Sequence, residues 1–338
     1  MKRTMLGLVL ALSVAVGYAG DESRKGTTGA DQLLIPVGAR NIGSAGAFVA
    51  SATGAEAIYY NPAGLAFGQG SEVMFSYMNY VADIGVSYFA GSVKFEELGT
   101  FGLSYKSLQF GDIPVTTFEN PDGTGSTYSP GFSTLGLSYA RPITDRVSAG
   151  VTAKLINESI LSTSAIGFAV DFGVQYKFQT DLWLGVTIKN IGSNMKYTGS
   201  DLLTSTTVPG TASGYQGGVY SPDTEPYQIP SYFELSMSYD YRIDDMNAVQ
   251  VGATFRNNNA LEDQAMVGLE YKLFNVLFLR GGYEGALKSS ARSIYGMNVG
   301  GGFDYQTEGA LRVSFDYAFR SVKEFPSDNH IFTVKLGF

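Results

Sequence analysis

The sequence predicts an all-β protein, a transmembrane antiparallel β-barrel of about 14 strands. Three observations support this prediction. The composition is poor in charge, runs of about ten residues alternate between apolar and polar positions, and the connections between the runs alternate in length. Together they favour a barrel over the secreted β-sandwich or propeller that the composition alone allows.

The composition departs from that of a soluble domain. Charged residues make up 16 % of the 338-residue chain, against about 25 % in soluble domains, while 42 Gly, 22 Tyr and 22 Phe are present. The chain has no cysteine, which excludes disulfides, thiolate chemistry and lipoprotein processing. Its formal charge of −8 argues against nucleic acid as a partner.

The first residues have the pattern of a secretory signal peptide. Lys2 and Arg3 form a basic start, residues 5–16 are mainly apolar, and small residues surround a cleavage site after Ala19. The apolar stretch of roughly 12 residues is too short for a membrane-spanning helix, which needs about 20. We therefore predict a signal peptide at 1–19, which precedes an N-terminal extension at 20–70 and an outer-membrane β-barrel at 71–338.

The strands are recognised by period-two alternation, which gives each strand two unlike faces. In residues 165–178 one face is polar, charged or small, and the other is apolar: Ile166, Phe168, Val170, Phe172, Val174, Tyr176 and Phe178. Similar runs predict strands near 71–79, 83–95, 99–108, 132–140, 146–157, 164–178, 182–190, 231–243, 247–256, 264–273, 276–284, 295–305, 310–320 and 329–338. Their number is even, as closure of a single-chain antiparallel barrel requires.

The lengths of the connections give an independent argument, because barrel hairpins alternate between short periplasmic turns and longer outer loops. The even-numbered connections are short: 96–98, 141–145, 179–181, 244–246, 274–275 and 306–309. The odd-numbered ones include 109–131, 192–230, 257–263, 285–294 and 321–328, and all but the first hairpin, near 80–82, are expected to be longer. Four tyrosines around the largest loop are interpreted as membrane-interface aromatics rather than a ligand-binding surface: Tyr215, Tyr220, Tyr227 and Tyr232.

The chain ends on an alternating run, residues 330–338. Its apolar face consists of Phe332, Val334, Leu336 and Phe338. A terminal Phe in register with three apolar residues is typical of the signal by which outer-membrane barrels are recognised for assembly. We therefore expect the barrel-assembly machinery and outer-membrane lipid as partners, and a Gram-negative-type outer membrane as the location.

The chain offers little catalytic chemistry. Its one histidine, His330, lies on the predicted final strand, so neither a multi-histidine metal site nor a Ser-His-Asp triad is expected. The acidic pairs at 244–245 and 262–263 lack the spaced ligands of a calcium loop. We predict no catalytic residue, no metal ion and no cofactor.

Charged residues on the polar faces of the predicted strands point into the lumen. The ones singled out are Asp171, Glu234, Arg256, Glu270, Arg280, Arg312 and Asp316. Both signs occur, so these side chains can neutralise one another, guide a substrate or anchor a plug. We expect Arg40 to pair with one of the lumen carboxylates, such as Asp171, Glu234, Glu270 or Asp316.

Residues 38–67 follow none of these patterns. Fourteen of the 30 are Gly or Ala, and the charged ones are Arg40 and Glu56. Such a segment is expected to pack closely against a structure that surrounds it. Gly38-Ala39-Arg40, Gly43 and the stretches 46–50 and 57–66 resemble the opening of the PorV/PorQ family, which belongs to the FadL-like group of outer-membrane proteins.

The resemblance implies a 14-stranded barrel whose N-terminal segment folds inside as a hatch, which makes residues 20–70 an N-terminal extension and hatch. The hatch contains Arg40, Asn61, Pro62, Ala63 and Gly64. FadL-like members move hydrophobic small molecules across the outer membrane, whereas PorV-like members serve type IX secretion. The implied function is therefore non-enzymatic, with either a hydrophobic ligand or secretion-system proteins as partners. A structural or porin-like protein with a permanent plug is the alternative.

Overall fold

The computed structural model describes residues 26–206, 218–288, 293–307, 311–323 and 325–338, and within them fourteen antiparallel strands form a closed barrel. These strands are β1 (Glu72–Asn79), β2 (Gly85–Phe95), β3 (Gly99–Gln109), β6 (Gly131–Pro142), β7 (Val147–Ile160), β8 (Thr163–Lys177), β9 (Leu182–Gly192), β13 (Tyr232–Arg242), β14 (Ala248–Asn258), β15 (Gln264–Leu273), β16 (Leu277–Ala286), β17 (Tyr295–Gln306), β18 (Arg312–Val322) and β19 (Asn329–Gly337). The barrel closes because β8 pairs with β9 and β1 pairs with β19. The predicted all-β class and the antiparallel barrel of 14 strands are confirmed.

The alternation of each strand separates a lumen face from a lipid face. In β8 the side chains of Ile166 and Phe168 are 64 % and 51 % exposed, whereas Ala169 and Asp171 are fully buried. The apolar face is therefore the outer one, since lipid rather than a protein core covers it. The four apolar residues of the last run also point outward. None of the helices in the described part of the chain is long and apolar enough to cross a membrane.

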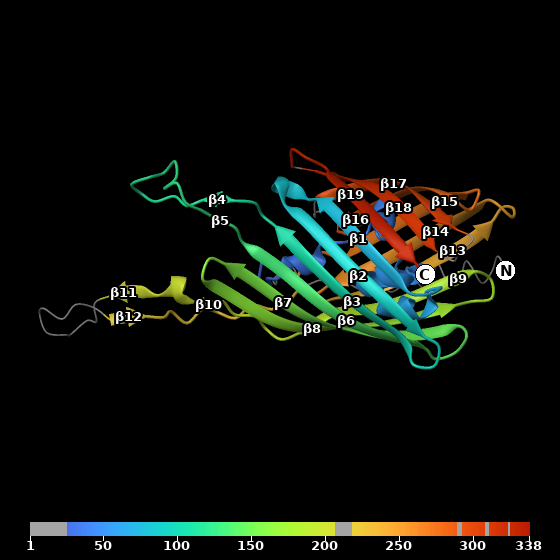
Figure 1. Ribbon diagram of the computed structural model, residues 1–338, viewed down its shortest axis with the longest axis horizontal. Helices are drawn as coiled ribbons and strands as arrows, with labels where there is room; N and C mark the ends of the chain where they lie inside the picture. Colours follow the sequence, from blue (N-terminus) through green and yellow to red (C-terminus); the bar gives the residue numbers. More distant parts are fainter. Residues whose placement is uncertain (1–25, 207–217, 289–292, 308–310, 324) are drawn as a thin grey trace, which may run out of the picture.

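One end of the barrel carries short turns and the other carries the long connections (Figure 1). Bacterial barrels place their short turns in the periplasm, which assigns the opposite end to the cell exterior. The prediction for the odd-numbered connections is wrong at one hairpin. Strands β7 and β8 extend past their predicted ends, so residues 161 and 162 alone join them.

Two outer connections contain small elements that project beyond the barrel rim (Figure 1). The first holds β4 (Ile113–Pro114) and β5 (Thr127–Tyr128), which pair with each other. The second holds β10 (Thr198–Gly199), the short helix η7 (Ser200–Leu202), β11 (Thr204–Thr206) and β12 (Gly218–Tyr220). Sequence analysis treated both stretches as loops, because strands of two or three residues leave no clear alternation.

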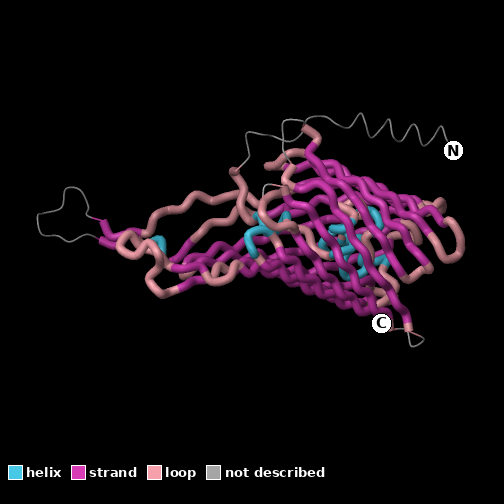
Figure 2. The backbone as a smooth tube through the Cα atoms, turned by 90° about the horizontal axis from the view of Figure 1, so that it is seen from above, coloured by secondary structure: helices cyan, strands magenta, loops and turns pink. Residues whose placement is uncertain are grey.

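Residues 30–67, which we call the inner segment, lie inside the barrel as a series of short helices (Figure 2). They are η2 (Asp31–Leu34), α2 (Ala39–Gly43), η3 (Val49–Ser51), η4 (Gly54–Glu56), α3 (Ala57–Tyr60) and η5 (Pro62–Phe67). The chain approaches from the outer end, where Thr28 pairs with Gln228 of the second outer connection. It leaves at the periplasmic end, where Ser71 and Phe338 exchange two backbone hydrogen bonds. The inner segment therefore runs through the lumen from one end to the other.

Candidate functional site: the inner segment and the lumen wall

A belt of glycines lets the inner segment approach the wall. Its members lie on eight different strands: Gly102, Gly150, Gly173, Gly185, Gly252, Gly268, Gly282 and Gly300. A methyl group on Gly185 would stand 2.7 Å from the Ala50 Cα, and one on Gly252 would stand 2.6 Å from the Ala47 carbonyl oxygen. Because real side chains do not approach so closely, the wall has no room for a larger residue. Several of these glycines face each other across neighbouring strands.

The Asn61-Pro62 step is fixed by contacts on both of its sides. The Asn61 side chain accepts a hydrogen bond from the Ala63 amide at 3.2 Å, which caps η5, and donates one to the Val174 carbonyl at 3.2 Å. Pro62 starts η5, where its missing donor costs nothing. A methyl group on Gly64 would overlap the Ala52 carbonyl oxygen. The geometry thus explains why an amide, a proline and a glycine stand at these positions.

Wall side chains satisfy backbone groups of the inner segment that have no partner within its short helices. Ser236 accepts from the Ala50 amide at 3.1 Å, and Thr333 accepts from the Ala39 amide at 2.8 Å. In the other direction, Gln175 donates to the Ala52 carbonyl at 2.9 Å. Buried backbone groups need such partners, so these wall side chains fix the position of the inner segment.

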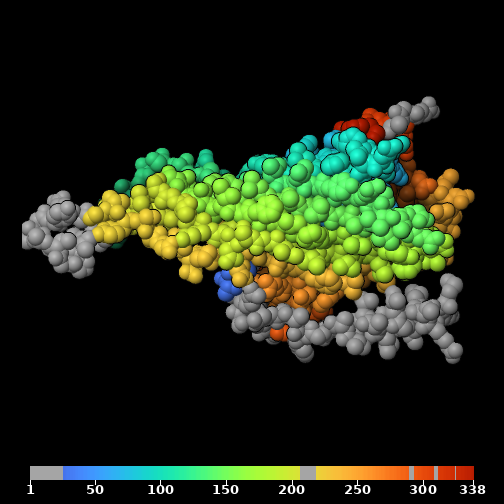
Figure 3. All heavy atoms as spheres, turned by 90° about the horizontal axis from the view of Figure 1, so that it is seen from below, coloured from blue at the N-terminus to red at the C-terminus, as the bar shows by residue number. Residues whose placement is uncertain are grey.

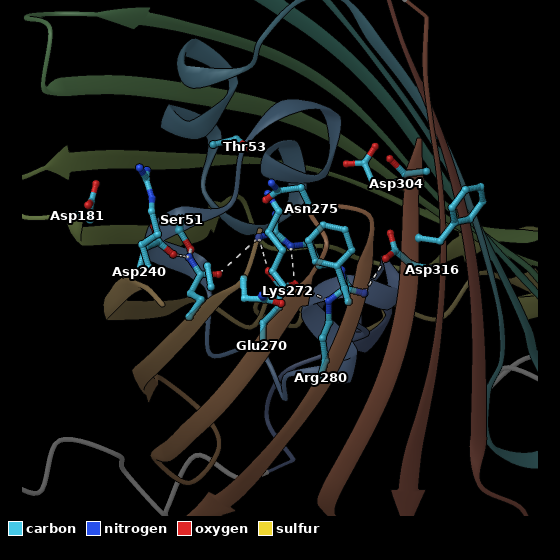
Figure 4. Close-up of a pocket in the computed structure, with 18 of the residues that line it drawn as sticks. Ser51, Thr53, Asp181, Asp240, Glu270, Lys272, Asn275, Arg280, Asp304 and Asp316 are labelled. Atoms are coloured by element: carbon cyan, nitrogen blue, oxygen red, sulfur yellow. Dashed lines mark hydrogen bonds and ion pairs between the residues drawn. The ribbon is translucent and has the colours of Figure 1, made fainter. Parts of the chain in front are cut away.

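Arg40 and Glu56 of the inner segment are joined by a chain of ion pairs along the wall. Arg40 lies 3.3 Å from Glu270, and Glu270 lies 2.5 Å from Arg280. Arg280 lies 2.6 Å from Asp316, which in turn is 3.6 Å from Lys335. The Lys335 ammonium is 3.7 Å from Glu56 and so closes the chain on the inner segment. Figure 4 shows Glu270, Arg280 and Asp316 side by side in this row. We name these six residues the charge chain.

The other predicted lumen charges are paired as well. Asp171 forms an ion pair with Lys154 at 2.5 Å, and Glu234 forms one with Arg256 at 2.8 Å. Arg312 pairs with Asp304 close to the periplasmic rim. All seven predicted lumen charges therefore have a partner of opposite sign. These charges neutralise one another and do not form a row of unpaired groups that could guide a charged substrate.

Two further lysines, on β3 and β9, bind the inner segment directly. Lys106 donates to the Ile35 carbonyl at 3.0 Å, and Lys189 donates to the Tyr59 carbonyl. Both ammonium groups also stand over the Tyr59 ring, at 5.0 and 4.0 Å from its centre. Tyr232 packs against Lys189 from the other side. Its interpretation as a membrane-interface residue is therefore wrong, because its ring is buried in the lumen.

A polar cavity of about 690 Å³ lies on the periplasmic side of the inner segment. Its floor includes Arg40 and Ser51, and its rim includes Asp181, Asp244 and Asn275 from the short turns. Most of its lining is charged, and Glu270, Arg280 and Asp316 of the charge chain lie along one side (Figure 4). On the opposite side of the inner segment, the second cavity is about 30 Å³ and has space for about one water molecule.

The second outer connection is tied to the start of the inner segment. Tyr197 and Tyr227 both donate hydrogen bonds to the buried Glu158 carboxylate, at 2.6 and 2.7 Å. The Tyr227 ring also covers Gly29, where a methyl group would be 2.5 Å from the ring. Burial and the hydrogen bond to Glu158 raise the pKa of both tyrosines above the usual value. Tyr227 is thus a structural contact rather than an interface aromatic, while Tyr215 lies outside the described residues.

The remaining candidates for chemistry lie apart from the lumen. His330 is on the outer face of β19, where its Nδ1 is 2.8 Å from the Tyr317 hydroxyl. Within the described ranges no group of three or more His, Cys, Asp or Glu side chains could hold a metal ion. Glu158 could not be singled out from the sequence, because its partners lie about 40 and 70 residues further along the chain, in the second outer connection.

The fold and the occupied lumen define an outer-membrane β-barrel that surrounds its own N-terminal segment. A family model described as "Type IX secretion system protein PorV" matches residues 18–209, which is more than half of the chain. The chain belongs to this family.

Solved structures share the fold at low sequence identity. The CymD monoaromatic hydrocarbon channel aligns with a TM-score of 0.57 at 14 % identity, covering 90 % of this chain and 98 % of that one. A Pseudomonas aeruginosa FadL homologue gives 0.54 at 14 % identity, with 90 % and 98 % covered. The P. putida toluene transporter TodX gives 0.54 at 14 % identity, with 89 % and 96 % covered. No curated protein sequence matches.

Proposed function

We propose that this protein is a non-enzymatic accessory of type IX secretion that receives a partner protein at its outer connections. In this proposal the inner segment keeps the lumen closed and so preserves the permeability barrier. The main observation in its favour is the close fit between the inner segment and the glycine belt. This fit supports the proposal that the inner segment is a permanent occupant of the lumen. The mature chain is proposed to start after Ala19, once the signal peptide at 1–19 is removed.

Three features support a closed lumen over a conduit. The belt glycines contact the inner segment on eight strands, and the seven predicted lumen charges are all paired. The large cavity is polar and lies on the periplasmic side, whereas pockets for small apolar ligands are lined mainly by apolar side chains. The partner would therefore act at the exterior, where both projections stand.

A second candidate function is passage of a hydrophobic small molecule, with the inner segment as a hatch that opens. One observation favours it. An apolar cluster lies near the outer end of β1 to β3, where Met78, Val86 and Leu108 pack with Ile35 and Ile42 of the inner segment. The half-buried Phe110 and Phe132 pack against this cluster. Such a cluster could accept an apolar molecule from outside before the hatch moves.

Deletion of the gene in the native host separates these functions. Under the secretion proposal, proteins that normally reach the cell surface accumulate in the periplasm, while uptake of a radiolabelled long-chain fatty acid and of toluene is unchanged. Under the transport candidate, uptake falls and secretion continues. If neither process changes, the protein is a structural barrel with a permanent plug, and both functions are rejected.

A further inference from the structure

The first outer projection has a rigid tip. Residues 110–130, which we call the β4–β5 arm, project beyond the barrel rim (Figure 1), at the same end of the molecule as the second projection (Figure 3). At the apex the backbones of Thr117 and Asn120 exchange two hydrogen bonds of 3.2 Å, so that Phe118 and Glu119 form a two-residue turn. The Thr117 hydroxyl also accepts from the Asn120 amide at 3.1 Å. Below the apex, Val115 bonds with residues 124 and 126 of the returning chain at 2.8 Å each.

The Phe118 side chain lies at this apex and is not covered by other residues. Its side chain is 99 % exposed, whereas the lipid-facing Phe75 and Phe168 are each 51 % exposed. Lipid cannot account for this exposure, because the arm extends past the barrel rim (Figure 1). Large aromatic side chains that stand free on a fixed turn are typical of anchors that enter a pocket on another protein.

The surroundings of Phe118 are acidic. The arm carries Asp112, Glu119 and Asp122, and the sequence has no Lys or Arg between Lys106 and Arg141. The second projection adds no basic surface, because its one lysine, Lys196, is paired with Asp223. Negative charge repels the phosphates of outer-leaflet lipid, whereas it attracts a basic protein surface and speeds its association.

We propose that the β4–β5 arm is a docking element, in which Phe118 enters an apolar pocket of a partner protein and Glu119 and Asp122 meet Lys or Arg side chains at the pocket rim. This inference rests on the proposed function for the presence of a partner at the outer end. It adds the partner's chemistry and the residue that anchors it.

The first test identifies the occupant in living cells. A photoreactive phenylalanine is placed at position 118, and a second chain carries the same probe at Ile143, which is 65 % exposed in a turn at the opposite end. We expect an adduct with a protein at 118 and no such adduct at 143. An adduct with lipopolysaccharide, an adduct with a second copy of this chain, or identical adducts at both positions would overturn the proposal.

The second test measures binding of the cross-linked protein, once purified, to this chain in detergent. Phe118→Ser is expected to weaken the affinity by about 30-fold or more, as loss of an anchor does, whereas Phe118→Trp retains it. Glu119→Lys with Asp122→Lys should slow association and remove its dependence on salt. The matched control Ile143→Ser should leave binding unchanged. Equal affinities for Phe118→Ser and the wild type would overturn the inference.

The two proposals fail in different ways. If gene deletion blocks secretion while Phe118→Ser secretes normally and position 118 gives no protein adduct, the docking element is rejected and the secretion function stands. If position 118 captures a protein and Phe118→Ser weakens its binding while gene deletion leaves secretion intact, docking stands and the secretion function is rejected.

Discussion

Arg40 of the inner segment forms an ion pair with Glu270 of β15 across 3.3 Å, at the floor of the periplasmic cavity. The Arg40 side chain is 22 % exposed, and that of Glu270 is 7 % exposed. Glu270 also accepts from Arg280, so the pair is the first link of the charge chain that returns to the inner segment at Glu56. The inner segment is therefore held at two points by one continuous row of wall charges.

Reversal of the Arg40 charge should loosen the inner segment. Arg40→Glu places two carboxylates together and leaves Glu270 short of one partner, and breaking a mostly buried pair costs about 3 kcal/mol. We expect a lower free energy of unfolding in urea and new conductance in planar bilayers.

The double variant Arg40→Glu with Glu270→Arg should recover part of both properties, because the pair is restored with its signs exchanged. Arg242→Glu is the control, since Arg242 lines the same cavity at its exposed rim. Equal conductance for the single and the double variant would contradict the pairing.

A larger residue in the glycine belt should displace the inner segment. Gly252→Ala brings a methyl group to 2.6 Å from both the Ala47 carbonyl oxygen and the Phe48 ring, and such overpacking costs about 1–3 kcal/mol. We expect increased sensitivity of cells to vancomycin, which an intact outer membrane excludes.

Gly281→Ala is the matched control for the belt. Position 281 lies in wall strand β16, two strands from β14, and its methyl group would have the Asn298 carbonyl oxygen at 4.0 Å as its nearest contact. This variant should resist vancomycin as the wild type does. Equal sensitivity of the two variants would show that the effect is not due to contact with the inner segment.

Alkaline pH should release the second outer connection from the barrel mouth. The folded-state pKa values of Tyr197 and Tyr227 lie above the usual value of about 10 because of burial and the bond to Glu158. Because the pKa of each tyrosine is higher in the folded state, the two neutral tyrosines stabilise the folded connection fully below about pH 10. This stabilisation is lost as the pH rises through their folded-state pKa values. Proteolysis between residues 193 and 231 should therefore accelerate above about pH 10.

The variant Tyr197→Phe with Tyr227→Phe provides the control for this titration. It removes both donors to the buried Glu158 carboxylate, so the connection should be cleaved faster already at neutral pH. Its cleavage rate should then lack the alkaline step. A step of the same size in this variant would assign the titration to other groups.

Loss of the terminal residue should impair assembly. Phe338 exchanges two backbone hydrogen bonds with Ser71, where the inner segment leads into the first strand, and its side chain is 66 % exposed on the lipid face. Deletion of Phe338 should reduce the heat-modifiable form on gels and its amount in the outer membrane. Phe338→Tyr keeps the backbone bonds and an aromatic ring, so it should assemble normally. Normal assembly of the deletion would reject residues 332–338 as the assembly signal.

The strands were predictable because their signal is local. Each strand separates lipid from lumen, so neighbouring residues such as Phe168 and Ala169 must differ in polarity. The lengths of the hairpins were also predictable from the ends of the alternating runs. The exception is the hairpin between β7 and β8, where both strands continue past their predicted ends without a visible change in the sequence pattern.

The contacts within the lumen were not predictable to the same degree. The sequence left four carboxylates as possible partners of Arg40. The structure shows that Glu270 is the partner, and this choice depends on strand register and on the path of the inner segment. The glycine belt was not predictable from the sequence, because its members are scattered over about 200 residues and come to surround the inner segment only when the barrel closes. The exposed apex at Phe118 likewise depends on two strands of two residues each.

The sequence by itself determined the barrel, the number of its strands, its orientation by turn length, and the small-residue character of residues 38–67. Those properties follow from the two-residue period of a strand and from side-chain volume. The tertiary structure decided which wall residues hold Arg40, Asn61 and Glu56, and that the outer connection is tied to wall strand β7 through Glu158. These contacts join residues up to about 280 positions apart, so they exist only once closure of the sheet has set the distances across the lumen.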